Sequence, residues 1–194
     1  TEIDDARVAR ELVEIAAKER ARAAATRAVA PLVEEAARLN VDISTILDPK
    51  LARVVLDGLR QVRDVDEVAS AAEPLLIRYG QPRDFDYNGG LAFYETSISG
   101  LGDIFVNPDP DAFDADERQL LFDSKWWSSP DPDATFIHEI GHRKHNEAIG
   151  TRRFDTMIDQ RLDASQRAVA RKVSEYAASS PVEFVAETYV LKVK

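Results

Sequence analysis

Residues 138–147, with the sequence HEIGHRKHNE, hold all three histidines of this 194-residue chain: His138, His142 and His145. On an α-helix, residues four apart lie on one face, separated by about 40° around the axis and by one turn along it. The imidazoles of His138 and His142 can therefore reach the same metal ion. A five-residue match of this kind also arises by chance, and the segment would then be a polar turn of an exposed helix.

The pattern H-E-x-x-H that begins at His138 is the signature of zincin metalloenzymes. It predicts that zinc lowers the pKa of its water towards about 7, that Glu139 accepts the proton, and that the hydroxide attacks a polarised amide carbonyl. Gly141 removes side-chain bulk, so that another helix or the substrate can come close. Because the chain has no cysteine, a transition-metal site must use histidine and carboxylate ligands, which suits zinc.

The third histidine, His145, lies seven residues, or about 10 Å, along the helix from His138. All three imidazoles cannot bind one ion over that length at bond distances of about 2 Å. We therefore expect that His145 does not bind the metal. It should either contact the ligands or face solvent. A longer metal-binding motif would need a histidine at position 148, which is Ala148. The third ligand is expected to be a carboxylate elsewhere in the chain.

Residues 173–190, VSEYAASSPVEFVAETYV, offer two such carboxylates, Glu183 and Glu187. They are four residues apart on a predicted helix that Pro181 can open, so both lie on one face. Two stacked carboxylates suit a neighbouring cation, whereas without one they would repel each other. Alternatively, Glu183 and Glu187 lie on a solvated face of the helix.

HEIGH, followed about 40 residues later by Y-x6-E-F-x-A-E, resembles the zinc-peptidase domain of the anthrax lethal factor-like family. This family also includes Pro-Pro endopeptidases and domains of phage minor head proteins and bacterial polymorphic toxins. The resemblance covers residues 126–190, and it extends loosely to residues 87–100. Residues 1–80 match no motif. Val185 replaces a phenylalanine that the family often has, which is a change of packing only.

The resemblance implies a role for each of six residues: His138, His142 and Glu183 bind zinc, Glu139 is the general base, Tyr176 stabilises the oxyanion, and Glu187 supports the site from behind a ligand. These roles make physical sense. A tyrosine hydroxyl aimed at developing negative charge stabilises a transition state, and a carboxylate behind a ligating histidine fixes its tautomer. The alternative for Tyr176 is an aromatic side chain packed in the core.

The rest of the sequence predicts a mainly α, α+β fold: a zincin-like metallopeptidase domain with a small β-sheet and a helical N-terminal part. Apolar periodicity and turn residues predict helices at residues 4–40 (two helices divided at Pro31), 49–62, 64–80, 114–122, 133–149, 154–178 and 181–193. LAFYETSI (91–98) and DIFVN (103–107) predict a hairpin or small sheet. We expect two parts, the helical residues 1–80 and the catalytic residues 81–194.

Three weaker features have competing interpretations. The acidic stretch 107–117 lacks the glycine and glutamate of a calcium-binding EF-hand loop, so turns and a helix cap explain it better. Trp126 and Trp127 either line a substrate cleft or pack beneath a loop. Zincins bind an extended peptide along an edge strand, and either predicted strand could be that edge.

The formal net charge of −10 argues against a nucleic acid or an anionic membrane surface as a partner. No stretch is long and apolar enough to span a membrane. The chain begins at Thr1, which suggests processing and leaves room for a removed targeting segment. We expect a secreted or virion-associated protein rather than a cytoplasmic one.

The sequence thus predicts a zinc metalloendopeptidase that acts on a peptide or protein substrate. Two other interpretations stay open. The zinc site could instead tie two helices together in a structural, virion-associated protein, or the chain could be a toxin or effector module of a larger parent protein. Neither the cleavage preference nor the oligomeric state follows from the sequence.

Overall fold

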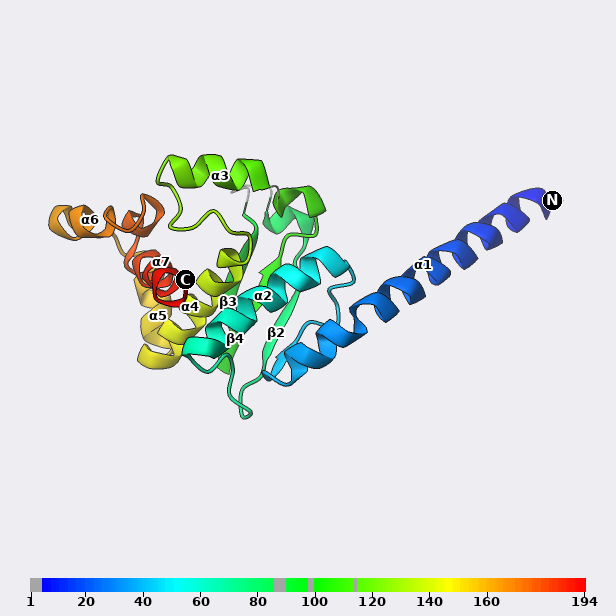
Figure 1. The fold of residues 1–194 in the computed structure, drawn as a ribbon, viewed down its shortest axis with the longest axis horizontal. Helices are drawn as coiled ribbons and strands as arrows, with labels where there is room; N and C mark the ends of the chain where they lie inside the picture. Colours follow the sequence, from blue (N-terminus) through cyan, green and yellow to red (C-terminus); the bar gives the residue numbers. More distant parts are fainter. Residues whose placement is uncertain (1–4, 86–89, 98–99, 114) are drawn as a thin grey trace.

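The computed structural model describes residues 5–85, 90–97, 100–113 and 115–194 (Figure 1). Within these residues helices dominate, and one small four-stranded sheet is present. This arrangement confirms the predicted α+β class with mainly helical content.

The sheet has the strand order β1-β2-β4-β3. Its strands are β1 (Val41–Asp42), β2 (Leu75–Tyr79), β3 (Ala92–Ser97) and β4 (Gly100–Val106). β2 is parallel to β1 and β4, whereas β3 is antiparallel to β4. The hairpin of β3 and β4 confirms the prediction for residues 91–98 and 103–107, although Ile98 lies outside the described residues. Of these two strands, β3 forms the edge of the sheet.

Residues 75–79 form β2 and not the end of a helix, so the helix predicted for residues 64–80 is wrong beyond Val65. α2 (Pro49–Val65) begins where the Asp48 carboxylate accepts a hydrogen bond of 2.8 Å from the Lys50 N–H. Pro74 then stands directly before the strand, and a proline disfavours a helix interior. Leu75 and Ile77 are buried while their neighbours face outward, which is the alternation of a strand covered on one face.

α1 (Asp5–Ala37) is one helix and not the two that Pro31 led us to expect. Pro31 lacks an N–H and costs a helix interior about 3 kcal/mol. The residues around it offset this cost by packing, because Val29 and Ala36 are buried in the core. The first half of α1 projects away from the body of the molecule (Figure 1), and Leu12 is 60% exposed.

Residues 154–178, predicted as one helix, form parts of three: α5 (Thr151–Ile158), α6 (Ala164–Ala170) and the 3-10 helix η3 (Tyr176–Ala178). Asp163 starts α6 with a capping box. Its carboxylate accepts from the Gln166 N–H at 2.8 Å, and the Gln166 side chain accepts from the Asp163 N–H at 2.9 Å. The single predicted helix is therefore wrong, because this box begins a new helix inside it.

The helices that carry the histidines and the late carboxylates are α4 (Ala134–Ile149) and α7 (Pro181–Val193), close to where the sequence predicts them. α4 packs against α7, α2 and the strands β3 and β4. α3 (Ala115–Asp123) matches the short helix predicted at 114–122, although Asp114 lies outside the described residues. The other 3-10 helices are η1 (Pro82–Asp84) and η2 (Pro110–Phe113).

The main core contains residues of α1, α2, the sheet, α4 and α7, among them Val29, Leu56, Ile77, Ile137 and Val190. The core and the sheet therefore use residues from both sides of position 80. A smaller apolar cluster lies around α6 and η3. No helix in the described part of the chain combines the length and the apolar character that crossing a bilayer requires.

Candidate metal centre

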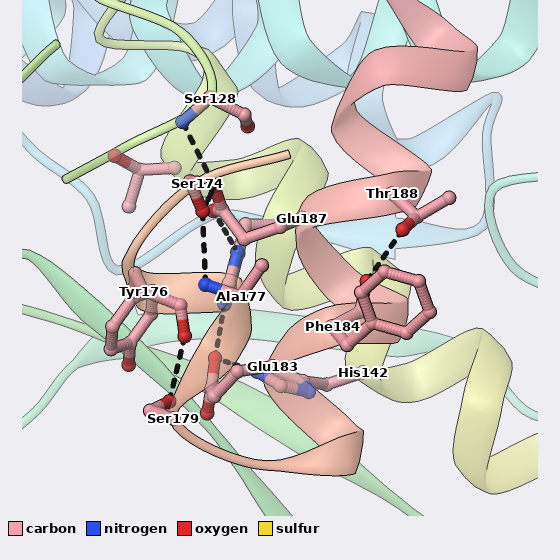
Figure 2. A network of polar contacts seen from close by, with 12 residues as sticks. Ser128, His142, Ser174, Tyr176, Ala177, Ser179, Glu183, Phe184, Glu187 and Thr188 are labelled. Carbon is pink, nitrogen blue, oxygen red and sulfur yellow. Dashed lines mark hydrogen bonds and ion pairs between the residues drawn. The ribbon is translucent and has the colours of Figure 1, made fainter. Parts of the chain in front are cut away.

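The six residues singled out in the sequence come together where α4, α7 and η3 meet. α4 carries His138, Glu139 and His142, α7 carries Glu183 and Glu187, and η3 carries Tyr176. Figure 2 shows Glu183 of α7 beside His142, with Glu187 on the same helix and Tyr176 on the neighbouring turn η3. All six side chains are buried or half-buried.

Gly141 allows the two site-bearing helices to approach closely. A Cβ atom at this position would lie 3.0 Å from the Cα of Ala186 and 3.0 Å from the Cβ of Tyr189, both on α7. Such contacts are too short for packed carbon atoms, so glycine permits this helix crossing. Of the two neighbours expected beside Gly141, helix or substrate, the structure places a helix there.

Three ligand atoms converge on one point between α4 and α7. The Oε2 of Glu183 lies 3.0 Å from the Nε2 of His138 and 3.3 Å from the Nε2 of His142. One ligand atom from each of these residues lies within 4.8 Å of the other two. Ligands bound at about 2 Å around a tetrahedral ion are separated by about 3.3 Å, so this donor set fits a metal ion.

His138 is oriented by Glu187, one helical turn beyond Glu183. The Nδ1 of His138 lies 2.8 Å from the Oε1 of Glu187. A carboxylate only accepts hydrogen bonds, so Nδ1 carries a proton, and Nε2 is the nitrogen that would coordinate a metal ion once it is deprotonated. Burial disfavours the charged imidazole, but the hydrogen bonds to Glu183 and Glu187 outweigh it and raise the pKa of His138.

Glu183 stays ionised although it lies in a largely buried site. Burial alone would raise its pKa, but the neighbouring His142 and His138 lower it well below the usual range. A metal ligand must be deprotonated, and Glu183 meets this requirement.

The side of the His142 ring that faces away from Glu183 is held by packing. Its Nδ1 is buried without a hydrogen-bond partner among the described residues. Its ring lies 6.1 Å from the ring of Phe154, nearly edge-on. His145 packs edge-on against the same phenylalanine at 5.5 Å and is not one of the grouped ligands. It is half-buried, and burial lowers its pKa.

Glu139 is a buried carboxylate beside the metal position. Burial raises its pKa, and the nearby His138 and His142 only partly offset this effect. A backbone hydrogen bond from Tyr94 of the edge strand β3 also favours its charged form. Burial thus moves this carboxyl towards the range in which it can exchange a proton near neutral pH.

Tyr176 lies over the ligand set with its ring 5.7 Å from the ring of His138. Burial raises the pKa of its phenol, and the negative charges of Glu183, Glu139 and Glu187 raise it further. The hydroxyl therefore stays protonated and is able to donate a hydrogen bond.

A cleft of about 560 Å³ opens beside His138, Glu139 and Tyr176. Trp126 and Trp127 both line it, in agreement with the first of their two interpretations. They also pack: the Trp126 ring lies 5.9 Å from that of Tyr176, and the Arg118 guanidinium lies 4.7 Å above Trp127.

Sequence reasoning missed three residues that organise this region: Ser128, Ser174 and Arg118. The Ser128 N–H and the Ser174 hydroxyl both donate to Glu187 at 2.9 Å. Arg118 is buried and donates to the carbonyls of Pro130 and Asp131 and to the Thr135 hydroxyl, which fixes the turn before α4. None of the three belongs to a motif, so their contacts follow only from the fold.

In the part of the chain that the structure describes, His138, His142 and Glu183 form the one group of three or more potential metal ligands. The acidic stretch 107–117, partly outside the described residues, adds no further group. The donor set of two imidazoles and one carboxylate is able to hold a metal ion. No protein-family model, curated protein or solved structure matches this chain.

Proposed function

We propose that this chain is a zinc-dependent metallopeptidase with a zincin-like fold. One observation carries the proposal: two imidazoles and a carboxylate converge on one point that borders a cleft, with a buried fourth side chain, Glu139, beside them. Three protein ligands leave a coordination position for water or substrate, as in catalytic zinc sites. The motifs HEIGH and Y-x6-E-F-x-A-E support the same reading.

Zinc, when bound, supplies a Lewis acid that acidifies water and polarises a carbonyl group. His138, His142 and Glu183 would hold it. The Glu139 carboxylate accepts a proton from water on the cleft side and then donates it to the leaving amine. Its raised pKa suits both transfers, because the group is a stronger base than an exposed glutamate and still releases the proton.

Tyr176 acts on the carbonyl oxygen of the substrate. As negative charge develops there, the phenol hydroxyl, which its raised pKa keeps protonated, donates a hydrogen bond to it. A preorganised donor of this kind contributes about 3 kcal/mol to the transition state. The raised pKa keeps the hydroxyl protonated throughout.

In this proposal, the peptide substrate binds along the edge strand β3. β3 borders the cleft at Ala92 and Phe93 and packs against α4. An extended peptide that adds to the edge of β3 with which no described strand pairs gains main-chain hydrogen bonds. Its scissile bond would pass between this strand and the start of α4, where Glu139 lies.

A structural role for the metal fits these residues less well. A structural zinc site normally fills its fourth position with another protein ligand. It also has no use for a proton acceptor such as Glu139 or for a hydroxyl donor such as Tyr176.

The decisive test compares the wild type with Glu139→Gln in zinc analysis and in a peptide-library cleavage assay. We expect both proteins to bind one zinc ion, because Glu139 is not among the ligands. Cleavage should fall at least about 100-fold in the variant, because proton transfer is lost. Stoichiometric zinc with no Glu139-dependent cleavage would overturn the peptidase and favour the structural role.

A further inference from the structure

Ser174 lies at the junction between the metal side of the site and the turn that carries Tyr176. It is 1% exposed, and its hydroxyl makes two hydrogen bonds, both 2.9 Å long, with the Oε2 of Glu187 and with the N–H of Ala177 (Figure 2). Ala177 follows Tyr176 directly in η3.

The chemistry of the partners fixes the direction of both bonds. The Ala177 N–H can only donate, so the Ser174 oxygen accepts from it. The Glu187 carboxylate can only accept while ionised, so the single hydroxyl proton of Ser174 points at Glu187. The Ser128 N–H also donates to the Oε2 of Glu187 and the Nδ1 of His138 faces its Oε1, so both oxygens of this carboxylate act as acceptors.

Glu187 is thereby held on both oxygens. Its Oε2 accepts from Ser174 and from the Ser128 N–H, and its Oε1 is left for the Nδ1 of His138. Removing the Ser174 hydroxyl leaves Oε2 with the Ser128 donor alone. Glu187 then gains rotational freedom, and it holds the His138 ring less firmly in one orientation.

The backbone of the η3 turn is also hydrogen-bonded to the loop before α4. The Glu175 and Tyr176 N–H groups donate to the carbonyls of Lys125 and Trp126, at 2.8 and 3.1 Å. These bonds attach the turn to the loop that lines the cleft. Ser174 alone among the described residues bonds both this turn and Glu187.

We propose that Ser174 is a positioning residue that couples the placement of Tyr176 to the orientation of His138 through Glu187. This inference rests on the proposed function. One hydroxyl would then set both the affinity for the metal and the position of the oxyanion donor.

The test is Ser174→Ala, measured for zinc affinity by competition with a chelator and for kcat and KM at saturating zinc. We expect zinc affinity to fall about 3- to 10-fold, less than the 10- to 100-fold typical when the partner of a ligating histidine is removed. The value of kcat should fall by a similar factor while KM changes less than about 2-fold, because Tyr176 acts on the transition state.

Ser179→Ala is the matched control. Ser179 lies just after the same turn, is exposed, and donates to the Tyr176 carbonyl at 2.7 Å. It does not touch Glu187, so the variant should retain wild-type zinc affinity. If Ser174→Ala does not fold, Ser174→Cys keeps the size with a weaker donor and should give a smaller loss of the same kind.

A double-mutant cycle separates positioning from general loosening. In the Glu187→Gln background, adding Ser174→Ala should lower zinc affinity by less than about 2-fold, since its effect passes through Glu187. The inference is overturned if the losses of zinc affinity caused by Ser174→Ala and Glu187→Gln multiply in the double variant. It is also overturned if Ser174→Ala and Ser179→Ala change zinc affinity equally.

The two proposals fail in different ways. Zinc binding without cleavage in the wild type overturns the peptidase, while the zinc affinities of the variants still decide the role of Ser174. Cleavage by a wild type whose zinc affinity is insensitive to Ser174→Ala overturns only the present inference. A wild type that binds no zinc overturns both.

Discussion

Glu183 and Glu187 are one turn apart on the same helix, yet their surroundings give them different tasks. The Oε2 of Glu183 faces the Nε2 atoms of both His138 and His142, where the three residues could hold a metal ion. Glu187 instead faces the opposite nitrogen of His138 and two hydrogen-bond donors. Because the two glutamates are one turn apart on the same face of α7, the local sequence does not distinguish their roles. Their positions relative to α4 do: Glu183 lies where it could bind a metal, and Glu187 lies where it orients His138.

This difference predicts unequal losses of metal. Glu183→Ala removes a ligand and should abolish stoichiometric zinc binding at micromolar protein. Glu187→Ala leaves all three ligands and removes one support, so zinc affinity should fall by about 10- to 100-fold. Zinc content after dialysis and chelator competition measure both. Equal losses, or a greater loss for Glu187→Ala, would contradict the ligand assignment.

The sequence alone was sufficient to name the residues that meet in the site. Helical spacing selects His138 and His142 and excludes His145, and the resemblance supplies Glu183, Tyr176 and Glu187. It was insufficient for Ser128, Ser174 and Arg118. A serine that bonds one carboxylate carries no recognisable spacing, because its partner is brought close by the fold and not by the helix period.

At the scale of elements, local patterns succeeded where a segment has one clear period and failed where packing decides. α4 and α7 have clear start signals. Pro31 suggested a break in α1, but burial of the residues around it keeps the helix continuous. The alternation of Leu75 and Ile77 after Pro74 was a strand signal hidden beside a helical stretch. Whether residues 75–79 form a strand depends on their pairing with β4, which is distant in sequence.

The crossing of α4 and α7 makes Gly141 a sensitive position. Gly141→Ala gains about 1 kcal/mol of helix propensity, but its Cβ would press on the backbone of Ala186, and overpacking costs about 1–3 kcal/mol. The net loss of stability should be small. Zinc affinity should fall at least about 10-fold, because α7 carries Glu183 and the ligand distances change with the spacing of the helices.

Two measurements check this expectation, the free energy of unfolding in urea and the zinc affinity. Ala148→Gly, at an exposed position in the last turn of α4, reports the propensity effect alone and should leave zinc affinity unchanged. Unchanged zinc affinity in Gly141→Ala would show that α7 can shift without moving its carboxylates.

At the scale of the whole molecule, the site joins two helices that are distant in the sequence, α4 and α7. His138 and His142 lie on α4, Glu183 lies on α7, and both helices also contribute to the main core. Hydrogen bonds between His138, Glu183 and Glu187 link the same two helices. Because α4 and α7 also pack into the main core, we expect a bound metal to stabilise the fold and not to create it.

This arrangement predicts a moderate rise in thermal stability with zinc. A ligand at 100 times its Kd stabilises the folded state by about 2.7 kcal/mol. For a domain of this size, each kcal/mol shifts Tm by about 2–4 °C, so Tm should rise by about 5–10 °C and return to its starting value with a chelator. Glu183→Ala should lose the shift, whereas Leu12→Ala, in the exposed first half of α1, should keep it. A cooperative transition that persists without zinc would agree with an ordered apo-protein, and loss of that transition on chelation would mean that the metal is needed to form the fold.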